Sequence, residues 1–157
     1  MKPNQRIANI VLDDDRRIRL SAQVEHERRV AVHDLLQENC FSPVDGFEGP
    51  FVVHLGMANG NLVFNVNDEA EKQLIAFILP LGDFRSLIKD YFVVCESYFN
   101  AIKTVSPSQI EAIDMGRRGL HNEGSELMRR RLADKVEIDI DTARRLFTLL
   151  CVLQIRA

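Results

Sequence analysis

Two arginines, a histidine and a glutamate lie close together in the second half of the chain, at Arg117, Arg118, His121 and Glu123. Arginine offers a planar fork of N–H donors that matches a carboxylate or a phosphate, and histidine exchanges a proton near neutral pH. The apolar spacing predicts one helix over residues 107–134, on which Arg117 and His121 are neighbours on the inward-facing side. Polar groups on such a side require either a partner or a ligand.

The first interpretation is a non-catalytic binding or interaction protein, in which Arg117, Arg118, His121 and Glu123 recognise a small anion or the same region contacts a protein partner. The alternative is an enzyme acting on an anionic metabolite, with His121 as acid or base and Arg117 or Arg118 as substrate clamp. A third interpretation is structural: Arg117 pairs with Asp114, and His121 bonds to a backbone carbonyl. The sequence leaves all three open.

Other chemistries fit these residues poorly. Asp114, His121 and Ser125 have the residue types of a hydrolase triad, but on one helix the first two stand about 10 Å apart, too far for a hydrogen bond. His121 and Glu123 point in nearly opposite directions and no HExxH pattern occurs, so the sequence indicates no metal site and no cofactor. A net charge of -3 argues against a nucleic-acid partner.

Three glycines fall within the predicted helix over residues 107–134: Gly116, Gly119 and Gly124. Each costs about 1 kcal/mol of helix propensity relative to alanine. Gly124 lies on the inward side, where the missing Cβ permits close approach by another helix or a ligand. The alternative is a break between the first and last of these glycines, which creates a new helix N-terminus suited to an anion.

The strongest structural pattern is a hairpin around Asn59-Gly60, because this dipeptide favours a type I′ turn. Residues 51–58 and 61–67 flank the turn, and apolar side chains alternate along both. A two-residue loop predicts these opposed pairs: Met57 with Leu62, Leu55 with Phe64, Val53 with Val66, and His54 with Asn65.

Periodicity and capping residues predict further strands over 7–12, 73–79 and 136–140, and helices over 21–39, 83–104, 107–134 and 141–154. Ser21 and Asp83 are the expected N-caps of the first two helices, and Ser106 opens a capping box at the third. The last helix is apolar nearly all round beyond Arg145, which indicates burial at the centre of the helical layer. The predicted fold class is α+β: a small, mostly antiparallel sheet built around the hairpin, packed against a layer of about four helices.

Composition predicts a single domain over residues 1–157, since 46% of the residues are hydrophobic and 27% are charged. Three widely spaced cysteines predict free thiols. Apolar runs fall short of the roughly 20 residues that span a bilayer, and the first residues lack the pattern of a signal peptide. We therefore expect a cytoplasmic protein that does not interact with membranes. A homodimer through the last helix or the His54 face of the hairpin is a further interpretation.

Several stretches resemble a family of small alphaproteobacterial cytosolic proteins known as an uncharacterised protein family. The stretches are residues 24–36, 49–55, 115–124 and 141–149. The resemblance extends over nearly the whole chain. It implies a single-domain protein of the bacterial cytosol, and it implies no activity, cofactor or catalytic residue.

Overall fold

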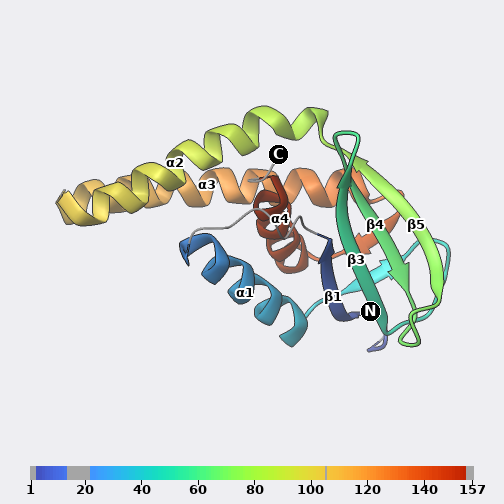
Figure 1. The fold of residues 1–157 in the computed structure, drawn as a ribbon. Helices are drawn as coiled ribbons and strands as arrows, with labels where there is room; N and C mark the ends of the chain where they lie inside the picture. The colour runs from blue at the N-terminus through green and yellow to red at the C-terminus, as the bar shows by residue number, and fades with distance from the viewer. Residues whose placement is uncertain (1–2, 14–21, 105, 155–157) are drawn as a thin grey trace.

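The computed structural model describes residues 3–13, 22–104 and 106–154. Helices lie on one side of a curved sheet (Figure 1), so the predicted α+β fold class is confirmed. The elements are, in order, β1 (Ile7–Asp13), α1 (Ala22–Gln37), β2 (Phe41–Pro43), β3 (Phe51–Ala58), β4 (Asn61–Asn67), β5 (Gln73–Pro80), the 3-10 turn η1 (Gly82–Phe84), α2 (Arg85–Thr104), α3 (Pro107–Leu132), β6 (Val136–Ile138) and α4 (Ile140–Gln154).

The main sheet has the strand order β1–β3–β4–β5. Its central hairpin has the predicted register, with all four predicted pairs opposed across β3 and β4. Asn59 and Gly60 have φ angles of 54° and 76°, the positive values that a type I′ turn requires. The remaining pairs are β1 parallel to β3 and β4 antiparallel to β5, while β2 and β6 form a separate antiparallel pair. The parallel pair is the part of the sheet that local sequence patterns did not indicate.

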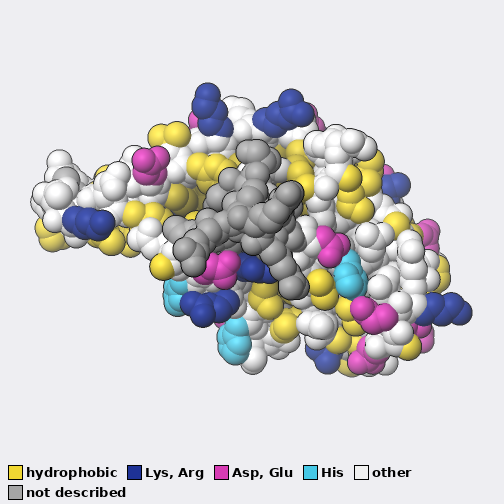
Figure 2. All heavy atoms as spheres, viewed as in Figure 1, with side chains coloured by type: hydrophobic (Ala, Val, Ile, Leu, Met, Phe, Trp, Pro, Cys, Tyr) yellow, Lys and Arg dark blue, Asp and Glu magenta, His cyan; other side chains and the backbone are white. Residues whose placement is uncertain are grey.

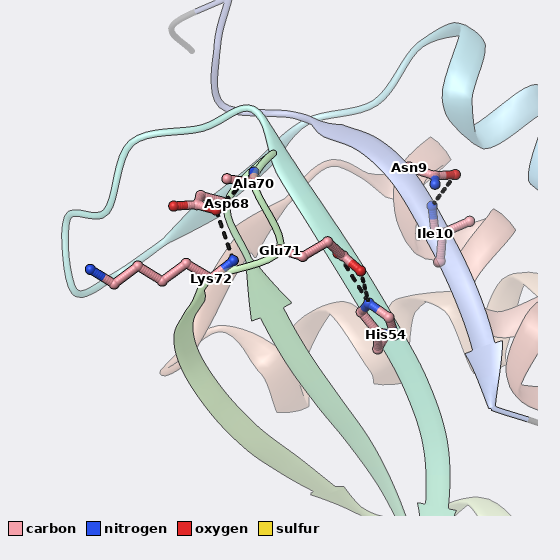
Figure 3. A network of polar contacts seen from close by, with 7 residues as sticks. All are labelled: Asn9, Ile10, His54, Asp68, Ala70, Glu71 and Lys72. Atoms are coloured by element: carbon pink, nitrogen blue, oxygen red, sulfur yellow. Dashed lines mark hydrogen bonds and ion pairs between the residues drawn. The ribbon is translucent and has the colours of Figure 1, made fainter.

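A short turn at the far end of the hairpin fixes the outer-face histidine of β3 (Figure 3). Asp68 Oδ1 accepts hydrogen bonds from the backbone N–H groups of Ala70 and Lys72, both at 2.9 Å. Glu71, at a φ of 63°, thereby reaches His54, whose Nε2 lies 3.2 Å from each carboxylate oxygen. His54 thus has a carboxylate partner within the chain.

The helical layer is centred on α4, which packs against α1 and α3, while α2 packs along α3 (Figure 1). Nine residues of α4 are buried, which confirms the predicted central position of the last helix. None of the described helices is both long and apolar enough to cross a bilayer.

The second helix begins differently from the prediction. Asp83 lies inside η1, one turn before α2, so the prediction that Asp83 caps a helix is wrong. Phe84 is fully buried and its backbone N–H bonds to the Leu81 carbonyl at 3.0 Å, which stabilises this turn instead. The Asp83 carboxylate pairs with Arg131 Nη2 at 2.7 Å. The predicted cap at Ser21 lies outside the described residues.

The third helix is unbroken from Pro107 to Leu132, so the alternative of a break at its glycines is wrong. Ser106 and Gln109 form the predicted capping box at its start. A Cβ at Gly124 overlaps the ring of Phe147 on α4, which explains why this position has no side chain. The glycine therefore allows α3 and α4 to approach closely beside His121.

Gly124→Ala should destabilise the protein by about 1–3 kcal/mol, because the Phe147 ring sits in a packed interface and cannot move freely. Gly119 is the matched control, since a Cβ there meets no atom within 4 Å. Gly119→Ala should be neutral or stabilise by up to about 1 kcal/mol through helix propensity. Urea unfolding of both variants measures the difference. Equal stabilities would contradict the packing role of Gly124.

Candidate functional site

A pocket of about 560 Å³ lies between α1, α3 and α4, with one contribution from α2. Three of the four predicted site residues line it: Arg117, Arg118 and His121. The structure adds Arg144 and Arg145 from α4, which sequence reasoning missed. We call this space the arginine pocket. Four guanidinium groups thus face one cavity from two helices.

Arg117 and Arg118 are held by a shared carboxylate one helical turn earlier. Arg117 donates from Nε and Nη2 to Asp114 Oδ1, at 3.1 and 2.6 Å. Arg118 Nε lies 3.1 Å from Asp114 Oδ2. The Arg117 guanidinium also lies over the Tyr98 ring, 4.5 Å from its centroid. The predicted pairing of Arg117 with Asp114 is therefore present, and it orients a side chain that lines the pocket.

Arg144 and Arg145 stand in the first turns of α4, where each has a carboxylate neighbour. Arg144 Nη1 is 3.4 Å from Asp141 Oδ1, and Arg145 Nη1 is 3.7 Å from Asp34 Oδ2 on α1. Both contacts are long and partly solvent-exposed, so they constrain the side chains only weakly. The guanidinium groups of α4 keep N–H donors available to the pocket.

Arg144 Nε is buried and has no hydrogen-bond acceptor among the described residues. A buried donor without an acceptor costs about 1–3 kcal/mol, and native structures contain few of them. Arg144 lines the arginine pocket with other atoms of its side chain, because Nε itself has almost no solvent-exposed surface.

Four neighbouring side chains hold the His121 ring in place. Nε2 lies 2.8 Å from the Thr148 hydroxyl, and Nδ1 lies 3.5 Å from the hydroxyl of the fully buried Ser125. The ring packs against Tyr91 and Phe147, with centroid distances of 5.5 and 5.2 Å. The structural interpretation expected a backbone carbonyl as the partner of His121, and the structure shows two hydroxyl groups instead.

Burial, together with the positive charges of Arg144, Arg117 and Arg145, lowers the pKa of His121 to about 4. The imidazole is therefore neutral at pH 7. Thr148 has one hydroxyl hydrogen, and its oxygen is placed to donate that hydrogen to the Arg144 carbonyl at 3.2 Å. His121 then carries its own hydrogen on Nε2 and donates it to Thr148. In this arrangement His121 links α3 to α4 without adding charge to the pocket.

Glu27 of α1 is the one carboxylate among the described residues that line the arginine pocket. Burial raises the pKa of its carboxyl group, and the nearby Arg117 and His26 offset part of this rise. The sequence placed Glu27 between His26 and Arg28 near the start of a helix, a context that gives no indication of its distant arginine neighbours.

Glu123, the fourth predicted site residue, is exposed and is not among the described residues that line the pocket. Glu123 follows His121 by two residues, so its side chain points about 200° away from that of His121 around the helix axis. Its role in binding stays a prediction. Within residues 3–13, 22–104 and 106–154, no group of three or more His, Cys, Asp or Glu side chains is arranged to hold a metal ion.

The fold and the pocket define a class: a small α+β protein with an arginine-lined cavity between three helices. The chain belongs to the uncharacterised protein family UPF0262, whose family model matches residues 4–156.

Similar proteins extend over the same length. The UPF0262 protein of Paramagnetospirillum magneticum is 56% identical over 156 residues, covering 99% of each chain. Those of Azorhizobium caulinodans and Rhodospirillum rubrum are 53% and 52% identical, covering 96% and 99% of this chain and 94% and 96% of their own. No solved structure matches this chain. These relatives support a bacterial protein, and their names state no activity.

Proposed function

We propose that this protein binds a small anion, a phosphate or a carboxylate, in the arginine pocket, without catalysing a reaction. The observation that supports this most directly is the lining of the pocket, to which α3 contributes Arg117 and Arg118 and α4 contributes Arg144 and Arg145. A phosphate or carboxylate group matches the planar fork of a guanidinium.

The charges of the lining support the same proposal. Among the described residues, four arginines and one carboxylate, Glu27, line the pocket, and burial raises the pKa of Glu27. Asp114, which pairs with Arg117 at Nε and Nη2, is not among the described lining residues. An anion in the pocket therefore meets several positive groups at once.

The alternative, an enzyme with His121 as acid or base, has less support. Both ring nitrogens face hydroxyl groups of the protein, and a pKa near 4 keeps the ring neutral at pH 7. A general base must reach the proton that it removes. His121 thus contributes to the proposed binding indirectly, because its contact with Thr148 holds α3, which carries Arg117 and Arg118, against α4. Catalysis that survives in His121→Gln would leave this alternative without its proposed residue.

The remaining expectations fit a small-molecule receptor. The candidate site is concave, which favours a small ligand over a protein partner. The buried residues form one core cluster that extends from β1 to α4, which supports a single domain. We propose that the protein is located in the cytoplasm.

Titration with phosphate, pyrophosphate and citrate tests the proposed function. The melting temperature should rise with ligand concentration, because a ligand that binds the folded state stabilises it. Arg117→Ala should weaken binding about tenfold or more, since it removes a charged hydrogen-bond donor. Arg130→Ala is the control, because it removes the same charge from an exposed position of α3 outside the pocket lining. Equal responses of the two variants to all three anions would contradict the proposal.

A further inference from the structure

A second pocket, of about 310 Å³, lies between α1, α2 and α4. It adjoins the arginine pocket, because Glu27, Tyr91 and Thr148 line both cavities. In Figure 2, hydrophobic side chains lie beside charged ones over α2, while charged and histidine side chains lie beside hydrophobic ones over α1. The two neighbouring cavities differ in their lining, with four arginines in the first and none among the described residues of the second.

The second pocket has an apolar lining, and we call it the apolar pocket. Its apolar members come from three helices: Val24, Phe92, Cys95, Phe99, Cys151 and Val152. Burial raises the pKa of both cysteine thiols, so they are neutral at pH 7 and behave as small apolar groups. The rest of the described lining consists of the exposed polar residues Gln23, Glu96 and Asn100 and the three residues shared with the arginine pocket. The apolar side chains of this cavity accept a hydrocarbon, and its two carboxylates, Glu27 and Glu96, disfavour an anion.

We propose that the ligand of this protein is an amphipathic anion: a phosphate or carboxylate head bound in the arginine pocket, with an alkyl or aryl tail in the apolar pocket. This inference rests on the proposed function, because it extends the anion across Glu27, Tyr91 and Thr148. Ligand sites commonly combine a mostly apolar lining with a few polar groups that fix orientation. The neutral hydroxyl of Thr148 and the ring of Tyr91 are compatible with either half of such a molecule at the junction.

The ligand is a free, soluble molecule and not a lipid that remains in a bilayer. The arginines line a cavity between α1, α3 and α4, so the head group must enter this cavity to meet the arginines of both α3 and α4. A bilayer head group held at a membrane surface stays outside. The volume of the apolar pocket, about 310 Å³, is at the small end of ligand cavities and suits a medium-length chain or one aromatic ring.

Titration calorimetry with inorganic, ethyl, butyl, hexyl and octyl phosphate, each below its micelle concentration, tests the inference. Affinity should rise with chain length by about fourfold per buried methylene and then level off when the pocket is full. If inorganic phosphate binds but every alkyl phosphate binds equally, the amphipathic ligand is excluded and the proposed function stands. If none of the five binds, the proposed function fails as well.

Cys95→Leu tests the location of the tail, because it fills the apolar pocket without touching the arginines. It should abolish the gain from hexyl and octyl chains and leave the affinity for inorganic phosphate unchanged. Val93→Leu is the control, since Val93 is exposed on α2 and lies outside the described lining of either pocket. A full chain-length gain in Cys95→Leu would overturn the inference. The wild-type series remains decisive if that variant does not fold.

Discussion

Arg144→Met should weaken phosphate binding about tenfold to a hundredfold while leaving the stability of the unliganded protein unchanged or higher. The loss follows from removing a guanidinium group that lines the pocket, because hydrogen bonds to charged groups contribute about 1.5–3 kcal/mol. Stability is maintained because the substitution also removes Arg144 Nε, which is buried without an acceptor. The ion pair lost with it, to Asp141, is exposed and long, so it contributes little. Calorimetry and urea unfolding measure the two effects.

Arg144→Lys tests whether phosphate binding depends only on the positive charge of Arg144 or also on the planar geometry of its guanidinium group. Lysine keeps the positive charge and lacks the planar fork, so it should restore only part of the affinity. Arg130→Met is the control for the loss of one arginine from an exposed surface. A strongly destabilised Arg144→Met that still binds phosphate like the wild type would show that Arg144 is a structural residue.

Acidification from pH 7 to pH 4 should cost the protein about 3 kcal/mol of unfolding free energy through His121 alone. Its pKa is about 4 in the folded state and about 6.5 in the unfolded state, so the unfolded chain binds the proton more tightly. The contribution of His121 is therefore complete above pH 6.5 and is lost as the pH falls toward 4. The cause is burial against Tyr91 and Phe147 beside three arginines.

His121→Gln isolates this contribution, because glutamine keeps a hydrogen-bonding side chain and does not titrate. The difference in unfolding free energy between wild type and variant should shrink by about 3 kcal/mol between pH 7 and pH 4. Glu27 changes stability in the opposite direction, since its raised pKa favours the folded state on acidification, and it is common to both proteins. A difference that stays constant with pH would show that His121 is not buried as described.

The hairpin was predictable because its information is local. Asn59-Gly60 specifies the turn, the turn fixes the register, and alternation along β3 and β4 specifies the buried face. The parallel pairing of β1 with β3 was not predictable in the same way. It joins residues more than forty positions apart, and no short-range pattern in residues 7–13 specifies which strand lies beside them.

The residues of the candidate site were likewise predictable only where the information that places them is local. Arg117, Arg118 and His121 were found because helical spacing places them on one side of a single helix. Arg144 and Arg145 were missed because only the packing of α4 against α3, permitted by Gly124, brings them to the same cavity. Their position just ahead of a fully apolar helix was the one signal available.

Arginine side-chain NMR gives the most direct test, because the Nε–Hε resonance of Arg144 reports on a guanidinium group that is proposed to bind the ligand. On titration with phosphate, that resonance should shift and reach saturation, while the resonance of Arg130 stays in place. Saturable binding at which Arg144 does not shift, or equal shifts at both arginines, would contradict anion binding in the arginine pocket.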